Sequence, residues 1–289
     1  MKSEECSCSV NSELFGRRGG FFDEAIAPLW SEVYDSLVAR ADVCKGSSVL
    51  DLGTGSGEVA IRLARAVGRK GKVLAIDEQS TMLGLARRKS RSRGLNIEFE
   101  QMSMEKMDLP VNRFDSVLAN YSLCCCMDYR AALKECLRVL RPGGRLTYNH
   151  GGPSDPLANQ VIFSLFEAYK SRSPSRKLRE FRRLRDAQVE AFRKYRDPFT
   201  CLELMRSLGF ENSEATLSRH SLRYKGARIY VDEWISFDWS PEAEEISAED
   251  LRRFRSEAIR ALAPLSKEPG FVVERDVVYF TGLKPSDRC

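Results

Sequence analysis

The sequence is poor in the residues from which metal sites and disulfide frameworks are built. It has only two histidines, His150 and His220, and none of its nine cysteines forms a CxxC pair. Three of the cysteines, Cys124–Cys126, are contiguous, and neighbours on an extended chain point in opposite directions. A zinc site therefore has few ligands available, and we predict neither a metal centre nor a disulfide framework.

Long apolar runs are missing as well. No stretch approaches the roughly 18 apolar residues that a membrane span requires. The first ten residues, MKSEECSCSV, carry acids and cysteines where a secretory signal would have a basic start and an apolar run. Together these absences predict a cytoplasmic protein with no transmembrane segment.

Positive charge is modest overall but unevenly distributed. The net charge is +5, whereas residues 170–196 hold eleven Lys or Arg against three acids and are +8 by themselves. Such a run is most often a solvated helix face, but it is also typical of a contact with RNA, a phosphorylated metabolite or a membrane surface. The apolar residues of this segment fall on one helix face: Leu178, Phe181, Leu184, Val189, Phe192 and Tyr195.

Short apolar runs alternate with helical patterns from Ser47 onward. We expect strands at 47–52, 72–77, 96–101, 114–120 and 145–150, and helices at 58–68, 80–93 and 129–140. Strands that alternate with helices are typical of an α/β fold, in which helices cover both faces of a parallel sheet.

The regular alternation breaks after Gly151-Gly152-Pro153. Residues 155–197 are expected to form a basic helical insertion that acts as a lid. The elements expected after it are a helix at 199–208, an extended stretch near 212–224, a helical region at 229–264 and a closing strand at 271–283. Helical spacing at 21–41 predicts an N-terminal extension, 1–45, that covers the substrate. The remainder, 46–289, is predicted to be one domain that contains the insertion.

A glycine-rich turn joins the first predicted strand to the first helix. In VLDLGTGSG (49–57) the glycines are Gly53, Gly55 and Gly57, which let the backbone approach a ligand closely. Dinucleotide-binding folds also use such a turn, but with the spacing GxGxxG. Asp51 would sit poorly beside a pyrophosphate, whereas it suits a cofactor with an ammonium group and no phosphate. Asp77 ends the next strand, where a carboxylate can accept both ribose hydroxyls.

At these residues the sequence resembles the class I S-adenosylmethionine-dependent methyltransferases, in the broad group that includes the ubiquinone and menaquinone C-methyltransferases. The resemblance rests on VLDLGTGSG, GKVLAID, FDSVLAN and RVLRPGGRL. It covers 45–150 well and 200–220 loosely. It implies a Rossmann-like sheet that is mostly parallel with an antiparallel last strand, and S-adenosylmethionine as the cofactor.

The resemblance also implies roles for matching positions. Asp51 and the loop from Gly53 through Thr54 and Gly55 to Gly57 would hold the methionine portion, and Asp77 would bind the ribose. Glu78 or Met82 would lie near the adenine, and Asn120, Tyr121 and Ser122 would form the floor of the pocket. The family often has Gly-Asp-Ala after the third strand, where this chain has Met102, Ser103 and Met104. Ser103 retains a hydrogen-bonding group, while the two methionines either pack on the adenine or fill the core.

Methyl transfer needs little acid–base chemistry from the protein. The cofactor supplies the reactive group, so the protein mainly aligns the reactants and excludes water. A base is required only if the acceptor must lose a proton. His150, at the carboxyl end of the strand 145–150, is a candidate base, with a structural role as the alternative. Tyr121 is a candidate for shaping the pocket, with a core position as the alternative.

Several acceptor classes follow from these features. The first is a small molecule, methylated by in-line displacement. The second is RNA or protein docked on the basic segment 170–196, for which binding would fall steeply with salt. Residues 120–123 lack the Asn/Asp-Pro-Pro-aromatic motif of enzymes that methylate base amino groups, so that chemistry is disfavoured. An arsenite-type, thiol-dependent methyltransferase using Cys124–Cys126 is a lesser alternative. A non-catalytic Rossmann-like protein is disfavoured by the glycine loop and Asp77. The oligomeric state has no sequence indicator.

Overall fold

A computed structural model of the chain describes residues 20–236, 239–266 and 270–286. The described chain divides into two compact units. Of the described residues, the first unit, called the sheet unit, contains 31–153, 188–218 and 277–286. The second, called the helical unit, contains 20–30, 154–187 and, from the stretch 219–276, residues 219–236, 239–266 and 270–276. Each unit is therefore assembled from three separate stretches of chain.

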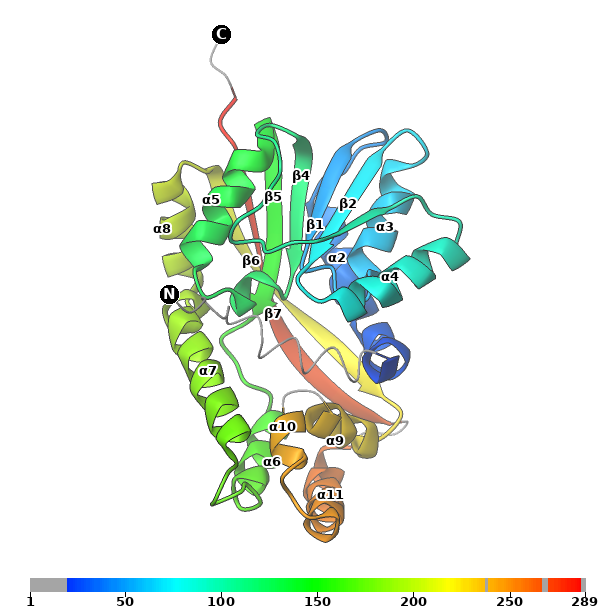
Figure 1. The fold of residues 1–289 in the computed structure, drawn as a ribbon, viewed down its shortest axis with the longest axis vertical. Coiled ribbons are helices and arrows are strands. Elements are labelled where there is room, and N and C mark those ends of the chain that lie inside the picture. Colours follow the sequence, from blue (N-terminus) through cyan, green and yellow to red (C-terminus); the bar gives the residue numbers. More distant parts are fainter. Residues whose placement is uncertain (1–19, 237–238, 267–269, 287–289) are drawn as a thin grey trace. The chain divides into compact units, whose positions relative to one another are not determined.

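Strands of the described chain form a single seven-stranded sheet in the order β3-β2-β1-β4-β5-β7-β6 (Figure 1). They are β1 (Ser48–Leu52), β2 (Lys72–Asp77), β3 (Glu98–Gln101), β4 (Phe114–Asn120), β5 (Leu140–Gly151), β6 (Glu211–Tyr224) and β7 (Phe271–Leu283). The pairs among β1 to β5 are parallel, and β7 is antiparallel to β5. The predicted Rossmann-like sheet with an antiparallel last strand is confirmed.

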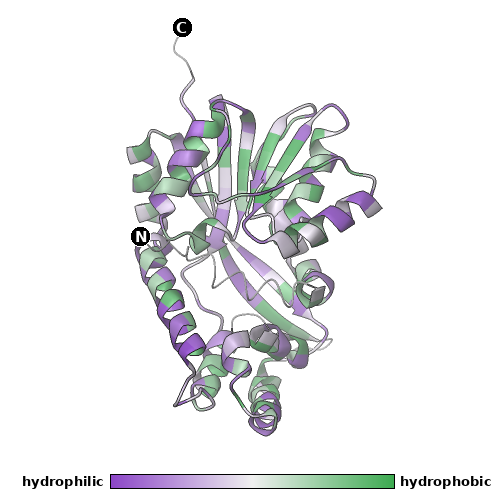
Figure 2. Ribbon diagram, viewed as in Figure 1, coloured by the Kyte–Doolittle hydropathy of each residue, from purple (hydrophilic) through white to green (hydrophobic). Residues whose placement is uncertain are grey.

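Central strands of this sheet are buried on both faces. In β1 and β2 the side chains are buried except for Ser48, Lys72 and Asp77 at the strand ends. This is the pattern of a parallel sheet that helices cover on both sides. Figure 2 shows the same strands as largely hydrophobic. This double burial explains why the two strands have almost uninterrupted apolar sequences.

Helices of the sheet unit pack against particular strands. They are α2 (Ser31–Arg40), α3 (Glu58–Val67), α4 (Ser80–Ser92), α5 (Tyr129–Val139) and α8 (Pro198–Leu208), with the short turns η3 (Leu123–Cys125) and η4 (Lys194–Arg196). Helix α2 contacts β4 and β5, α3 contacts β1 and β2, α4 contacts β2 and β3, and α5 contacts β5. The predicted end of α8 is confirmed, because Gly209 follows it with φ +102°.

The helical unit has a core rich in aromatic side chains. Its elements are η1 (Phe22–Ile26), η2 (Ala27–Trp30), α6 (Leu157–Glu167), α9 (Ala227–Ser236), α10 (Ser240–Ala243), α11 (Ala248–Leu262) and η5 (Ala263–Leu265). The rings of Phe166 and Trp239 stack at 4.0 Å, and Phe254 lies edge-on to Phe166. Residues 21–41, predicted to be helical, are divided between the two units, so the boundary predicted at residue 45 stays a prediction.

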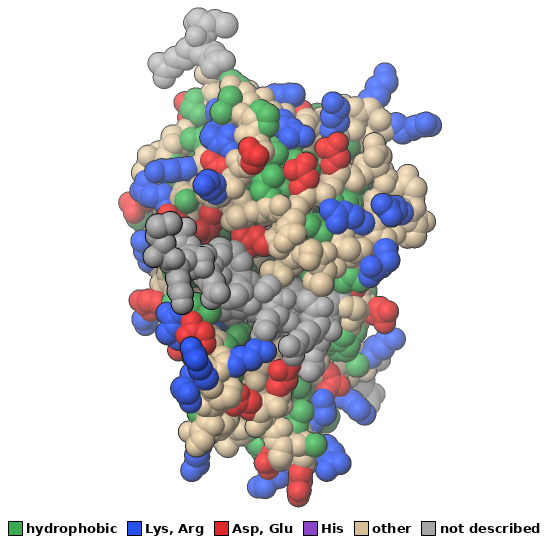
Figure 3. Space-filling view, viewed as in Figure 1, with side chains coloured by type: hydrophobic (Ala, Val, Ile, Leu, Met, Phe, Trp, Pro, Cys, Tyr) green, Lys and Arg blue, Asp and Glu red, His purple; other side chains and the backbone are tan. Residues whose placement is uncertain are grey.

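Helix α7 (Arg176–Arg193) carries the basic segment. Figure 3 shows Lys and Arg along it, interspersed with acidic side chains. On the predicted apolar face, Leu178 and Phe181 are buried, whereas Val189 is 57% exposed. Arg182 forms a two-pronged ion pair with the buried Glu242 of α10, at 2.7 and 2.6 Å. None of the described helices combines the length and the apolar character that crossing a membrane requires.

Candidate cofactor and active site

At the end of β1 the glycine loop lies close to two other chain segments, one that contains Ser122 and one that contains Met104. Gly53, Gly55 and Gly57 have φ of +62°, +54° and +86°, a backbone region that strains other residues. A Cβ on Gly53 would lie 2.4 Å from the Cβ of Ser122 and 3.1 Å from the Cε of Met104. Glycine at this position is therefore required both by the backbone conformation and by the lack of space.

Asp77 fastens this loop to the end of β2. Its carboxylate accepts hydrogen bonds from the N–H of Gly55 at 2.8 Å and from the N–H of Gln79 at 2.8 Å. Burial raises the pKa of Asp77 above its ordinary value, although these two N–H groups act in the opposite direction. Each carboxylate oxygen keeps a further lone pair with which to accept a ligand hydroxyl.

Asp51 lies in the interior beside the same loop, with 1% of its surface exposed. The Thr54 hydroxyl donates to its Oδ2 at 2.6 Å. Burial, together with the charge of Asp77, raises the pKa of Asp51 to about 7. Among the described residues, no Lys or Arg forms an ion pair with Asp51 or Asp77. Two carboxylates that lack a protein cation suit a ligand that brings its own positive charge.

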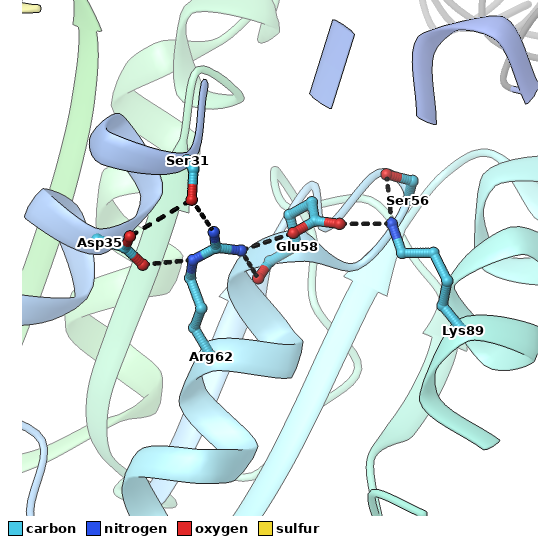
Figure 4. A network of polar contacts seen from close by, with 6 residues as sticks. All are labelled: Ser31, Asp35, Ser56, Glu58, Arg62 and Lys89. Atoms are coloured by element: carbon cyan, nitrogen blue, oxygen red, sulfur yellow. Dashed lines mark hydrogen bonds and ion pairs between the residues drawn. The ribbon is translucent and has the colours of Figure 1, made fainter. Parts of the chain in front are cut away.

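An ion-pair network supports the loop from outside (Figure 4). Arg62 on α3 contacts Asp35 and Ser31 on α2 and also Glu58 on its own helix, at 2.6, 2.7 and 2.6 Å. Lys89 on α4 then bridges Glu58 at 2.7 Å and the loop residue Ser56 at 3.3 Å. Three helices are thus tied to the loop through Glu58. No spacing pattern in the sequence predicts this network.

Residues predicted to lie around the adenine are distributed over two segments. Met82 of α4 is buried, with its Cε 3.7 Å from the position of a Cβ on Gly55. Met104 reaches Gly53, and both Met102 and Met104 pack against the core of the sheet unit. Ser103 accepts from the N–H of Glu105 at 3.4 Å. The half-buried Glu78 accepts the Gln101 amide on its carbonyl at 2.9 Å. Their contacts with adenine stay predictions.

The end of β4 has an unusual backbone. Tyr121 adopts φ +50°, which is uncommon for a residue with a bulky side chain and tends to occur at functional sites. The Ser122 hydroxyl donates to the carbonyl of Leu52 at 2.7 Å, which joins the ends of β4 and β1. Asn120 and Tyr121 both contact the side chain of Asn149, a residue that the sequence analysis did not select.

Known proteins match this arrangement. A family model described as a methyltransferase domain matches residues 49–144. The ubiquinone/menaquinone biosynthesis C-methyltransferase UbiE of Francisella tularensis subsp. novicida is 33% identical over 183 residues, which cover 61% of this chain and 72% of that protein. The chain belongs to the class I S-adenosylmethionine-dependent methyltransferases. Its cofactor is S-adenosylmethionine.

Solved structures of other proteins share the fold of this methyltransferase. The phosphoethanolamine N-methyltransferase 2 of Haemonchus contortus superposes with a TM-score of 0.60 at 16% identity, covering 99% of this chain and 62% of that one. The YcgJ protein of Bacillus subtilis gives 0.53 at 16% identity, covering 88% and 99%. At such low identity these similarities show a shared fold and nothing about the acceptor.

His150 of the methyltransferase is enclosed at the end of β5. It is 2% exposed, and its ring lies 5.2 Å from Phe192 and 4.9 Å from Phe280. Its Nδ1 is 2.8 Å from the Gly151 carbonyl and its Nε2 is 3.8 Å from the Cys201 thiol. Burial lowers the pKa of His150, so the ring is neutral at physiological pH. These contacts support a packing role; its role as a base stays a prediction.

Cys124 and Cys125 lie in the turn η3 after β4, and Cys126 follows this turn. Cys124 is half-buried, Cys125 is exposed and Cys126 is buried. A hydrogen bond with Cys125, together with burial, raises the pKa of the Cys124 thiol, and burial raises that of Cys126. Such thiols remain protonated, whereas metalloid binding requires thiolates. Across the described part of the chain, no cluster of three or more His, Cys, Asp or Glu is placed to hold a metal ion. The thiol-dependent alternative therefore gains no support.

Proposed function

We propose that this methyltransferase acts on a small molecule, a hydroxylated aromatic or quinone-like ring that it methylates on carbon in the cytoplasm. The observation that carries the proposal is the 183-residue match to a protein named as a C-methyltransferase of ubiquinone and menaquinone biosynthesis. The absence of proline at residues 120–123 is consistent with it, because amino groups of nucleic-acid bases are then disfavoured acceptors.

The residues around the glycine loop fit the cofactor. S-adenosylmethionine supplies a methyl group on a positively charged sulfur and also carries an ammonium group. In the proposed site Asp51 faces the ammonium group and Asp77 accepts the ribose hydroxyls. The loop Gly53–Gly57 lets the backbone approach the cofactor closely. The protein then aligns the acceptor carbon and excludes water.

A hydroxylated ring places few demands on the side chains of the protein. When the ring hydroxyl is ionised, the electron pair at the neighbouring carbon forms the new bond to methyl as the methyl–sulfur bond breaks, and the electrons of that bond stay on the sulfur of S-adenosylhomocysteine. The proton on the methylated carbon is lost once the product reaches solvent, which restores the aromatic ring. This route requires no protein base within reach of the carbon. It is consistent with the enclosed position of His150, whose ring nitrogens already have neighbours.

The second candidate is a macromolecule bound on α7. The helix retains positive charge, but part of it is neutralised within the protein by the pairs Arg182–Glu242, Arg183–Glu180 and Arg193–Glu190. This internal pairing favours the solvated-face interpretation of the basic segment over a nucleic-acid surface.

An acceptor screen with methyl-labelled S-adenosylmethionine tests the proposal. The panel contains hydroxylated aromatic rings with a free ring carbon, primary amines, transfer RNA and basic proteins, each at low and high salt. We expect label on a ring compound, at a rate that changes little with salt. As a matched pair, Asp77→Ala should abolish the signal at limiting cofactor, while the double variant R172A/R176A should leave it unchanged.

Label on RNA or protein would contradict the proposal. A rate that falls steeply with salt and falls again in R172A/R176A would assign the acceptor to the basic segment 170–196, since each phosphate contact adds to the salt dependence. Label on amines alone would retain a small acceptor but reject methylation on carbon.

A further inference from the structure

A row of polar side chains crosses three strands at the carboxyl end of the parallel sheet. Asn120 of β4 lies opposite Asn149 of β5, which in turn lies opposite Tyr279 of β7. Asn149 has no exposed surface, and it sits at the centre of this row. A buried amide requires partners for both its donor and its acceptor.

Both ends of the Asn149 amide are used at the exit of β4. Its Nδ2 donates to the Oδ1 of Asn120 at 3.0 Å, and its Oδ1 accepts from the backbone N–H of Tyr121 at 2.9 Å. Tyr121 is the residue with φ +50°, a conformation that persists only where neighbouring groups hold it. One side chain thus orients the Asn120 amide and anchors the strained backbone that follows it.

Tyr279 of β7 is the neighbour of Asn149 on the other side of β5. Burial raises the pKa of Tyr279 to about 12, so its hydroxyl is neutral, and a hydrogen bond with Asn149 is among the contacts of this group. The same hydroxyl donates to the carbonyl of Val33 at 3.3 Å, and the guanidinium of Arg40 lies 4.1 Å from the ring centre. Asn149 therefore has a defined orientation before any ligand arrives.

We propose that Asn149 is a positioning residue for the cofactor. It acts through Asn120 and Tyr121, which it holds in the conformation that receives S-adenosylmethionine at the exit of β4. The inference rests on the proposed cofactor site and on the expectation that Asn120 and Tyr121 form the floor of its pocket. Without Asn149, the Asn120 amide loses its orientation and the Tyr121 backbone relaxes to a commoner conformation.

Binding of S-adenosylhomocysteine to the full chain, measured by calorimetry, tests this role. Asn149→Ala should weaken binding by about tenfold, the loss that typically follows removal of one or two buried hydrogen bonds. If that variant is too unstable to purify, Asn149→Leu keeps the branched shape of the side chain without polar groups and should show the same loss. Affinity of the folded fraction is the informative quantity, because a merely structural role would lower the melting temperature and leave that affinity unchanged.

Thr147 provides a matched control on the same face of β5. It is equally buried, and within the described chain its hydroxyl has no hydrogen-bond partner. Thr147→Val should therefore leave the affinity unchanged. Equal affinities for wild type, N149A and T147V would overturn the inference.

A double-mutant cycle with Asn120→Ala distinguishes action through Asn120 from an independent effect. We expect the loss in N120A/N149A to be smaller than the product of the two single losses, since both variants disable the same group. Independent, multiplicative losses would reject the proposed route. Asp77→Ala is the control for the cofactor site itself. If this variant also leaves binding unchanged, the assignment of the cofactor site has failed and not only the role of Asn149.

Discussion

The ionised form of Asp51 should favour cofactor binding but disfavour folding, because this carboxylate is buried. The pKa of Asp51 is raised from 3.8 to about 7 by burial, so the folded state retains a proton that the unfolded chain has already released. Between these two values the folded state binds more protons than the unfolded state. The contribution of Asp51 to the free energy of unfolding therefore decreases as the pH rises through this interval and reaches its lowest value above pH 7.

Replacing this acid by its amide should stabilise the free protein. Asp51→Asn removes the buried charge but keeps an oxygen for the Thr54 hydroxyl. We expect a higher melting temperature than wild type above pH 7, and a difference that shrinks as the pH falls toward 4. Thermal unfolding across this pH range measures it. Asp128→Asn, at an exposed helix cap, is the control; an equal gain at every pH in D51N would contradict the burial argument.

The same acid should make cofactor affinity depend on pH. A positively charged ligand beside Asp51 favours the ionised carboxylate, so binding releases the proton that the free protein holds. Wild-type affinity for S-adenosylmethionine should rise as the pH increases through about 7, whereas that of D51N should be weaker and nearly flat. Calorimetric titration on both sides of pH 7 checks this. A parallel pH profile in D51N would place the titrating group elsewhere.

At the scale of elements, Glu58 joins α2, α3 and α4. Burial alone would raise the pKa of Glu58, but its bonds with Lys89 and Arg62 outweigh this effect and hold the pKa below its ordinary value. The stabilisation from this network is therefore complete above the unfolded pKa of about 4.5 and is lost as the pH falls through the lower, folded pKa.

Glu58→Gln should weaken this connection. We expect a loss of about 1 kcal/mol at neutral pH, or a few degrees in melting temperature, with a smaller loss at high salt. Thermal unfolding at two salt concentrations measures both effects. Glu180→Gln on α7 removes an exposed pair of similar geometry and should cost less. A loss in E58Q that is unaffected by salt would indicate that shape, and not charge, makes the difference.

Element positions were largely predictable because apolar periodicity is local. The strands at 72–77, 114–120 and 271–283 have the predicted bounds, and the helices predicted at 58–68, 80–93, 129–140 and 199–208 each differ by one residue at one end. The helical regions predicted at 155–197 and 229–264 are each divided into separate helices. Strand β5 begins at Leu140 and not at residue 145, because Leu140 pairs with Phe114 ahead of the glycine turn and the register then shifts. That pairing depends on a distant strand, so periodicity within the segment carried no sign of it.

The candidate site also combines residues that the sequence predicts with residues that it does not. Asp51, the glycine loop and Asp77 form a spacing pattern that the sequence displays, and the structure brings them within hydrogen-bonding distance of one another. Asn149 and the Glu58 network have no such pattern, because their partners come from strands and helices that are distant in the chain. Asn149 lies in RLTYNH among other polar residues, so no particular sign of it was present in the sequence.

For the whole molecule, we expect ligand binding to stabilise the sheet unit more than the helical unit. All proposed cofactor residues belong to the sheet unit. S-adenosylhomocysteine at a hundredfold excess over its Kd should add about 2.7 kcal/mol to the unfolding free energy of the state that binds it. Hydrogen exchange should then slow in peptides that cover 49–57, 77–82 and 120–122.

Peptides from the aromatic core of the helical unit are the internal control for this experiment. Those covering α6 and α11 contain no proposed cofactor residue, so we expect smaller changes in them. Protection of α11 equal to that of the glycine loop would show that cofactor binding stabilises both units as one cooperative body.

The order of strands has a consequence for synthesis of the chain. Strand β7 lies between β5 and β6, although β6 precedes it by 46 residues, from Tyr224 to Phe271. On the ribosome, β1 to β5 can pair as they emerge, but β6 has no sheet neighbour until residues 271–283 have been translated. During that interval β5 and β6 each present an open edge, the kind of surface through which incomplete chains associate. Nascent chains that stall before residue 271 are therefore the ones that we expect to recruit chaperones.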